Sequence, residues 1–191
     1  MALLAKIIVS FFKVLGLIIR IFERNRKKDI YAFKEELIEP GYAEKIITDD
    51  KNPHPLLDIL WKIQKKCEHG RKLEQLTSRE RVIYLTDEVN GQVHSSGFCH
   101  YFFYPSGANS KEAIMALKEI GAPYTASLVQ EAKNVYRNGF THCWKNPPED
   151  EVELTDEEME RLDTLDNKFY EYRENLDELQ MKYIKEHIED F

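Results

Sequence analysis

Residues 109–135 read NSKEAIMALKEIGAPYTASLVQEAKNV, and this stretch decides the fold class. Its first half consists mainly of strong helix formers. The triplet Gly121-Ala122-Pro123 then ends one helix and begins the next, because glycine is favoured just past a helix end and proline at the first helical position. We therefore predict a hairpin of two helices over 110–120 and 123–137. No stripe of basic residues runs along the two helices of this hairpin, so we expect no direct binding to nucleic acid.

The C-terminal third has a second helical pattern. It begins with a capping box, in which the Thr155 hydroxyl accepts from the backbone of Glu158 and the Glu158 carboxylate bonds back to the backbone of Thr155. Apolar residues then follow at alternating steps of three and four, which is the spacing of a helix that packs along one seam. The seam consists of Leu162, Leu165, Phe169, Tyr172, Leu176, Leu179 and Tyr183. We expect one long helix over 155–190.

Two more helices are expected before the hairpin. Residues 56–68 carry apolar side chains at helical spacing. A capping box at Thr77 begins the next helix, which we expect to end at the turn pair Asn90-Gly91. The aromatic run 98–104 is interpreted mainly as core, and lining of a groove for a partner peptide is the alternative.

Together these patterns predict an all-α protein. A single helical domain over 56–191 follows a connecting helix and linker over 29–55 and a separate N-terminal helix over 1–28. Of the 191 residues, 42% are hydrophobic and 32% charged, which suits helices with solvated outer faces. The three cysteines are far apart, which favours a reducing, cytoplasmic environment. The net charge of −7 is uneven, since residues 149–191 contain 17 acidic residues and only five basic ones.

Residues 1–28 form an apolar and basic segment. Lys6, Lys13 and Arg20 are seven residues apart, so on a helix they form one stripe beside an apolar surface. Such a helix suits a membrane interface. Four further cations favour an anionic cytoplasmic leaflet: Arg24, Arg26, Lys27 and Lys28. We expect the protein to lie on the cytoplasmic face of a membrane, with this helix either in the membrane plane or spanning it. The alternative is a helix packed on the chain's own domain or a dimer mate, in a soluble cytoplasmic protein.

Several short motifs follow one another in a fixed order within residues 77–135. They are Asn90-Gly91, Gly97-Phe98, Tyr101-Phe102, Ser106-Gly107 and Ile120-Gly121-Ala122. In this ordered set the chain resembles the bacterial DNA-mimic protein family (domain of unknown function 4375), and the resemblance covers roughly residues 56–191. Two features depart from the family pattern. Five residues separate Asn90-Gly91 from Gly97-Phe98, and Cys99-His100 stand where polar residues are usual.

The resemblance implies an all-α domain, often a homodimer, whose acidic side chains imitate DNA phosphates and occupy the basic site of a DNA-binding protein. Such imitation needs carboxylates placed on a firm scaffold, because a partner selects the position of charge as well as its sign. The candidate protein-binding residues are Asp156, Glu160, Asp163, Glu171, Glu174 and Glu178, which share one stripe of the expected C-terminal helix with Asn167. Another protein partner and a merely solvated helix face are the alternatives.

Catalytic and metal chemistry find little support in the sequence. Cys99-His100 and His142-Cys143 are adjacent pairs, whereas zinc ligands are typically paired at spacings of about two to five residues. No phosphate-binding loop or Gly-x-Ser-x-Gly motif occurs. We therefore predict no catalytic residue, no metal site and no cofactor. The leading hypothesis is a non-enzymatic, membrane-associated protein-binding module. A DNA mimic that blocks a basic transcription regulator comes second, and a metal-dependent or thiol hydrolase third.

Overall fold

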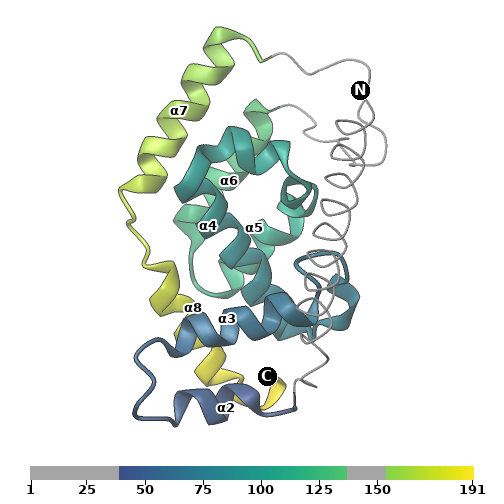
Figure 1. The fold of residues 1–191 in the computed structure, drawn as a ribbon. Helices are drawn as coiled ribbons and strands as arrows, with labels where there is room; N and C mark the ends of the chain where they lie inside the picture. Colours follow the sequence, from purple (N-terminus) through teal and green to yellow (C-terminus); the bar gives the residue numbers. More distant parts are fainter. Residues whose placement is uncertain (1–38, 137–153) are drawn as a thin grey trace, which may run out of the picture. The chain divides into compact units, whose positions relative to one another are not determined.

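The computed structural model describes residues 39–136 and 154–191 (Figure 1). Its α-helices are α2 (Tyr42–Ile47), α3 (Pro55–Lys66), α4 (Ser78–Phe103), α5 (Ser110–Glu119), α6 (Pro123–Val135), α7 (Asp156–Tyr170) and α8 (Leu176–Glu186). Three short 3-10 turns are η1 (Leu73–Gln75), η2 (Pro105–Asn109) and η3 (Ile188–Asp190). The described residues contain no β-strand, so the predicted all-α fold is confirmed. The expected N-terminal helix over 1–28 and the start of the connection lie outside the described residues.

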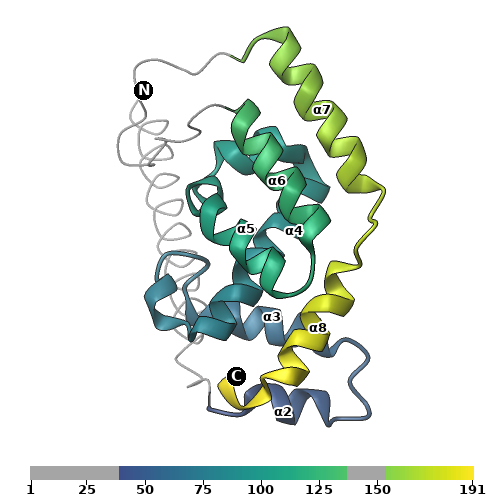
Figure 2. The ribbon, with the colours of Figure 1, turned by 180° about the vertical axis from the view of Figure 1, so that it is seen from behind.

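Helix α4 lies at the centre of the domain and contacts α3, α5, α7 and α8. The α5–α6 hairpin packs on one side of it, and α7 runs along α4 and α6 (Figures 1 and 2). The aromatic run contributes the largest buried side chains, since Phe98, Tyr101 and Phe102 are each 1% exposed or less. Burial of one such side chain stabilises a fold by roughly 1.5–3 kcal/mol, so these three side chains are a main part of the core. Phe103 and Tyr104, at the end of the run, are exposed.

The hairpin predicted at Gly121 is confirmed. Gly121 has a positive φ of 90°, and its backbone N–H donates to the carbonyl of Lys118 at 3.1 Å. The N–H of Ala122 donates to the carbonyl of Leu117 at 2.8 Å, which completes a Schellman ending for α5. Pro123 then occupies the first turn of α6.

Helix α4 does not end at Asn90-Gly91, so that predicted boundary was wrong. The helix continues to Phe103, because Val89 and Val93 are both fully buried and their packing outweighs the turn preference of the Asn-Gly pair. The break comes instead at Gly97, whose φ of 76° kinks the helix. A Cβ at Gly97 would collide with the carboxylate of Asp166, and the positive φ adds strain for any residue other than glycine.

The prediction of one long C-terminal helix over 155–190 was also wrong, because two helices, α7 and α8, fill this region. The Thr155 capping box is present, but α7 ends at Tyr170 and Tyr172 adopts a left-handed conformation with φ of 48°. A new cap starts α8, since the Asn175 side chain accepts from the backbone of Glu178 at 3.2 Å. The apolar seam therefore belongs to two helices with different directions.

Residues 39–55, expected as part of a connection, include α2, which packs on α3. The Gly41 N–H donates to the carbonyl of Phe191 at 2.8 Å, so this segment is tied to the end of the domain.

A fully buried carboxylate, Glu80, completes the Thr77 capping box and also pairs with Lys66 Nζ at 2.7 Å. Among the described helices, none is both long and apolar enough to cross a membrane.

Candidate functional site

The outer side of α7 carries an acidic surface. Asp156, Glu160, Asp163 and Glu171 are all exposed, and we call these four residues the α7 acidic face. They lie opposite the buried side of the same helix, which consists of Leu162, Leu165 and Phe169. Fifteen residues of helix span about 22 Å, a length over which one DNA strand carries about six phosphates. The face is therefore long enough to meet several cations of a partner, at lower charge density than DNA.

Most of this face has no partner among the residues that the structure describes. No hydrogen bond or ion pair within residues 39–136 and 154–191 engages the carboxylates of Asp156, Glu160 and Asp163. Glu171 pairs with Arg173, whose Nη2 lies 2.6 Å from Oε2 in an exposed position. An exposed ion pair of this kind is worth about 0–1 kcal/mol, so a partner's cation can replace it.

Glu174 and Glu178 do not extend this face, which corrects the predicted stripe. The helix break places Glu174 against α6, where its carboxylate accepts from the backbone of Tyr124 at 2.9 Å and of Thr125 at 2.8 Å. The Thr125 hydroxyl adds a third hydrogen bond at 2.8 Å. Glu174 is thus the N-terminal cap of α6, a helix whose own N-cap residue makes no side-chain bond. Glu178 is exposed in the first turn of α8.

A second internal carboxylate, Asp166, lies near the α7 acidic face. Its Oδ1 accepts from the backbone N–H of Phe98 at 2.8 Å, just after the α4 kink. Burial raises the pKa of Asp166, and the charge of Asp163 adds to that increase. Burial also raises the pKa of the Cys99 thiol, with further contributions from Asp166 and Asp163. A raised pKa disfavours the thiolate, which is the reactive form of a cysteine.

The family-motif residues form the scaffold around this region. Gly97, Phe98, Tyr101 and Phe102 are buried in α4, and Ser106 Oγ donates to Gln92 Oε1 at 2.6 Å. A Cβ at Gly107 would lie 2.7 Å from Phe102 Cα, so this glycine permits close packing. Gly91 lies on the exposed side of α4, and Gly121 in the α5–α6 turn. The motif thus fixes the core packing and carries no part of the acidic face.

The histidine and cysteine residues do not converge on a metal site within the described chain. His94 lies among the rings of Phe169, Tyr170 and Tyr172, with centroid distances of 5.0, 5.9 and 5.3 Å. His142 and Cys143 are outside the described residues. The described residues bring three potential ligands together only at His187, Glu189 and Asp190, which are largely exposed at the C-terminal end.

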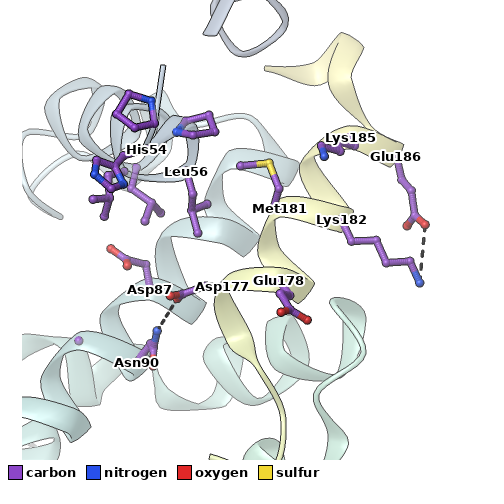
Figure 3. A pocket seen from close by; sticks show the side chains of 15 residues that line it. His54, Leu56, Asp87, Asn90, Asp177, Glu178, Met181, Lys182, Lys185 and Glu186 are labelled. Carbon is purple, nitrogen blue, oxygen red and sulfur yellow. Dashed lines mark hydrogen bonds and ion pairs between the residues drawn. The ribbon is translucent and has the colours of Figure 1, made fainter. Parts of the chain in front are cut away.

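A groove lies between α3, α4 and α8 on the described surface (Figure 3). Its volume is about 990 Å³, and its walls include Leu56, Leu57 and Met181. Two acidic residues, Asp87 and Asp177, lie next to each other beneath these side chains. Burial raises the pKa of Asp87 to about 6, with a further increase from the charge of Asp177. The groove combines apolar walls with carboxylates, which is a typical composition for a binding site.

The sequence patterns did not indicate the roles of Asp87, Asp166, Glu174 or Asp177. One signal was present for the helix break, because Asn175 followed by Glu178 has the spacing of a helix start. The contacts of Asp87 and Asp166 join residues that are 23 and 68 positions apart in the chain. No local pattern reports such pairs.

The fold and site together define an all-α protein with an exposed acidic helix. A model of the DMP19-like protein family matches residues 74–187, and the chain belongs to this family. DMP19 is a family of DNA mimics, so the DNA-mimic part of the resemblance is supported, whereas the designation as domain of unknown function 4375 is not. No curated protein and no solved structure matches the chain significantly.

Proposed function

We propose that this protein is a non-enzymatic DNA mimic, whose α7 acidic face occupies the basic site of a nucleic-acid-binding protein. The observation that carries the proposal is that no described residue pairs with the carboxylates of Asp156, Glu160 and Asp163, which lie on a helix of a DMP19-like domain. Other carboxylates of the domain, such as Glu80 and Glu174, are used up in capping and ion pairing. The free ones are those available to a partner's lysine and arginine residues.

The scaffold under α7 supports this role. Leu162 and Leu165 are 2% exposed or less, and Asp166 attaches the helix to the kink of α4. A rigid support matters because charges held in place lose little conformational entropy when a partner binds. Electrostatic attraction of this kind raises association rates and weakens with added salt.

A charge-matched pair of variants tests the proposal. Asp156→Asn, Glu160→Gln and Asp163→Asn together remove three charges from the α7 acidic face. Glu44→Gln, Glu74→Gln and Glu131→Gln remove three exposed charges from α2, η1 and α6, and so serve as the control. The full chain and both variants are used to capture proteins from a bacterial lysate, with elution by a salt gradient.

We expect the full chain and the control to capture the same basic protein, and the α7 variant to lose it. The captured protein should bind duplex DNA, and added duplex should release it from the chain because both compete for one site. Equal capture by the two variants would contradict the proposal. So would a captured protein that binds DNA and this chain at the same time.

A further inference from the structure

The groove between α3, α4 and α8 has features that the DNA-mimic proposal does not use. Asp87 comes from α4 and Asp177 from the first turn of α8, so the two carboxylates belong to different elements from the α7 acidic face. Each accepts one hydrogen bond from a neighbouring amide. Gln64 Nε2 donates to Asp87 Oδ2 at 3.0 Å, and Asn90 Nδ2 donates to Asp177 Oδ1 at 3.0 Å. An ionised carboxylate offers about four acceptor positions, so the described residues leave further positions on both carboxylates open.

Within the described residues, no ion pair neutralises these two carboxylates. The two lysines of the lining, Lys182 and Lys185, come from α8. Lys182 is directed away from Asp87 and Asp177 and pairs with Glu186, with Nζ 3.8 Å from Oε1 (Figure 3). Two adjacent negative charges repel one another, and burial of one of them strengthens that repulsion. A cation from outside the domain would relieve it.

The walls of the groove specify more than charge. Leu57, Leu60 and Met181 line it with apolar side chains, and Leu57 is 61% exposed. Arginine and lysine join an apolar stem to a charged head, so they fit carboxylates that lie beside apolar side chains. A hard cation such as Mg²⁺ or Ca²⁺ takes oxygen ligands and would gain nothing from leucine or methionine. The volume of about 990 Å³ also exceeds what one side chain fills, which favours a short segment of polypeptide.

We propose that this groove binds a basic amphipathic peptide segment of a protein partner. An arginine or lysine head group contacts Asp87 and Asp177, and apolar neighbours in the peptide pack on Leu57 and Met181. The groove and the α7 acidic face are separate sites, so this binding does not depend on DNA mimicry.

The test uses a fluorescein-labelled hexapeptide of alternating leucine and arginine, titrated with the full chain and followed by fluorescence anisotropy. The groove variant carries Asp87→Asn with Asp177→Asn, and a second groove variant carries Leu57→Ser. The control, Glu160→Gln with Asp163→Asn, removes two charges from the α7 acidic face. Circular dichroism and thermal unfolding check that every variant folds, and Leu57→Ser is the mildest because its side chain is mostly exposed.

We expect the charge variant of the groove to raise Kd by about tenfold or more, as for loss of charged hydrogen bonds. Leu57→Ser should also weaken binding, whereas the α7 control should change Kd by less than about threefold, as for exposed charges. Equal weakening by both charge pairs would overturn the proposal, since it would show attraction to net charge alone. Absence of binding to the unmodified chain would overturn it too. Spermidine, a cation without apolar side chains, should not displace the peptide at equal concentration. Displacement would overturn the proposal, because it would show that the apolar walls do not contribute to binding.

Discussion

Replacing Asp87 by asparagine tests whether the domain holds a charge in the groove at a cost in stability. Asp87 is only partly exposed, its Oδ2 accepts from Gln64 Nε2 at 3.0 Å, and burial raises its pKa from 3.8 to about 6. Asparagine has nearly the same shape and keeps an acceptor for Gln64. It also offers an N–H donor towards Asp177. The substitution therefore removes the charge and preserves the packing.

The pKa gives the sign and the size of the effect. The folded protein binds the Asp87 proton more tightly than the unfolded chain does, so the free energy of unfolding falls as pH rises from 3.8 to about 6. The difference between the two pKa values corresponds to about 3 kcal/mol of unfolding free energy, at about 1.4 kcal/mol for each pKa unit, if Asp87 is wholly excluded from water. Partial exposure of Asp87 to solvent reduces this figure to about 1–2 kcal/mol. Asp87→Asn should gain that amount at pH 7 and nothing below pH 3.8, where both proteins are uncharged at this position.

Urea unfolding at several pH values between about 4 and 7, at constant ionic strength, measures the difference. Glu131→Gln, an exposed change on α6, is the control and should stay within about 0.5 kcal/mol of the unmodified chain. Lower stability of Asp87→Asn at pH 7 would refute the reasoning. A gain of the same size at pH 4 and pH 7 would also refute it, because the ionised carboxylate would not then be the cause.

Three further predictions concern the α4 kink, the helix break and the N-terminus. Gly97→Ala should lower the free energy of unfolding by about 2–4 kcal/mol, since it forces alanine into a positive φ and displaces Asp166 from Phe98; unchanged urea unfolding would contradict this. Glu174→Ala should lower the free energy of unfolding by about 1–3 kcal/mol because it uncaps α6, whereas the exposed Glu171→Ala should lower it by less than about 0.5 kcal/mol. Equal losses in thermal or urea unfolding would contradict the assignment of Glu174 as the cap. Deletion of residues 1–28 should move the protein from the membrane fraction to the soluble fraction of cells, and a full chain found wholly soluble would refute the membrane prediction.

Local patterns predicted those elements whose stabilising contacts are also local. The capping boxes at Thr77 and Thr155 and the glycine ending at Gly121 join residues within a few positions of each other, and all three are present. The two errors concern boundaries that distant contacts decide. Burial of Val93 in the core carries α4 past Asn90-Gly91, and the contact of Glu174 with α6 ends the C-terminal run. Periodicity alone cannot report either contact.

For the candidate site too, local spacing predicted one part and distant contacts decided the rest. Helical spacing placed Asp156, Glu160 and Asp163 on one exposed side of α7, as expected for residues within one helix. The stripe failed beyond the helix break, because side-chain spacing has meaning only within a continuous helix. The groove could not be predicted at all, since Asp87 and Asp177 meet through packing of α4 against α8.

The family match and the acidic surface carry different information about function. The motif residues of α4, such as Gly97 and Phe98, lie in the core, so a chain that keeps them keeps the scaffold. The proposed binding to a basic partner would depend on exposed carboxylates, and these lie outside the motif. Two chains with this fold could therefore share every packing contact and still present different charge patterns. The charge-matched variants at Asp156, Glu160 and Asp163 address this separation directly, because they change the surface without touching the buried seam of α7.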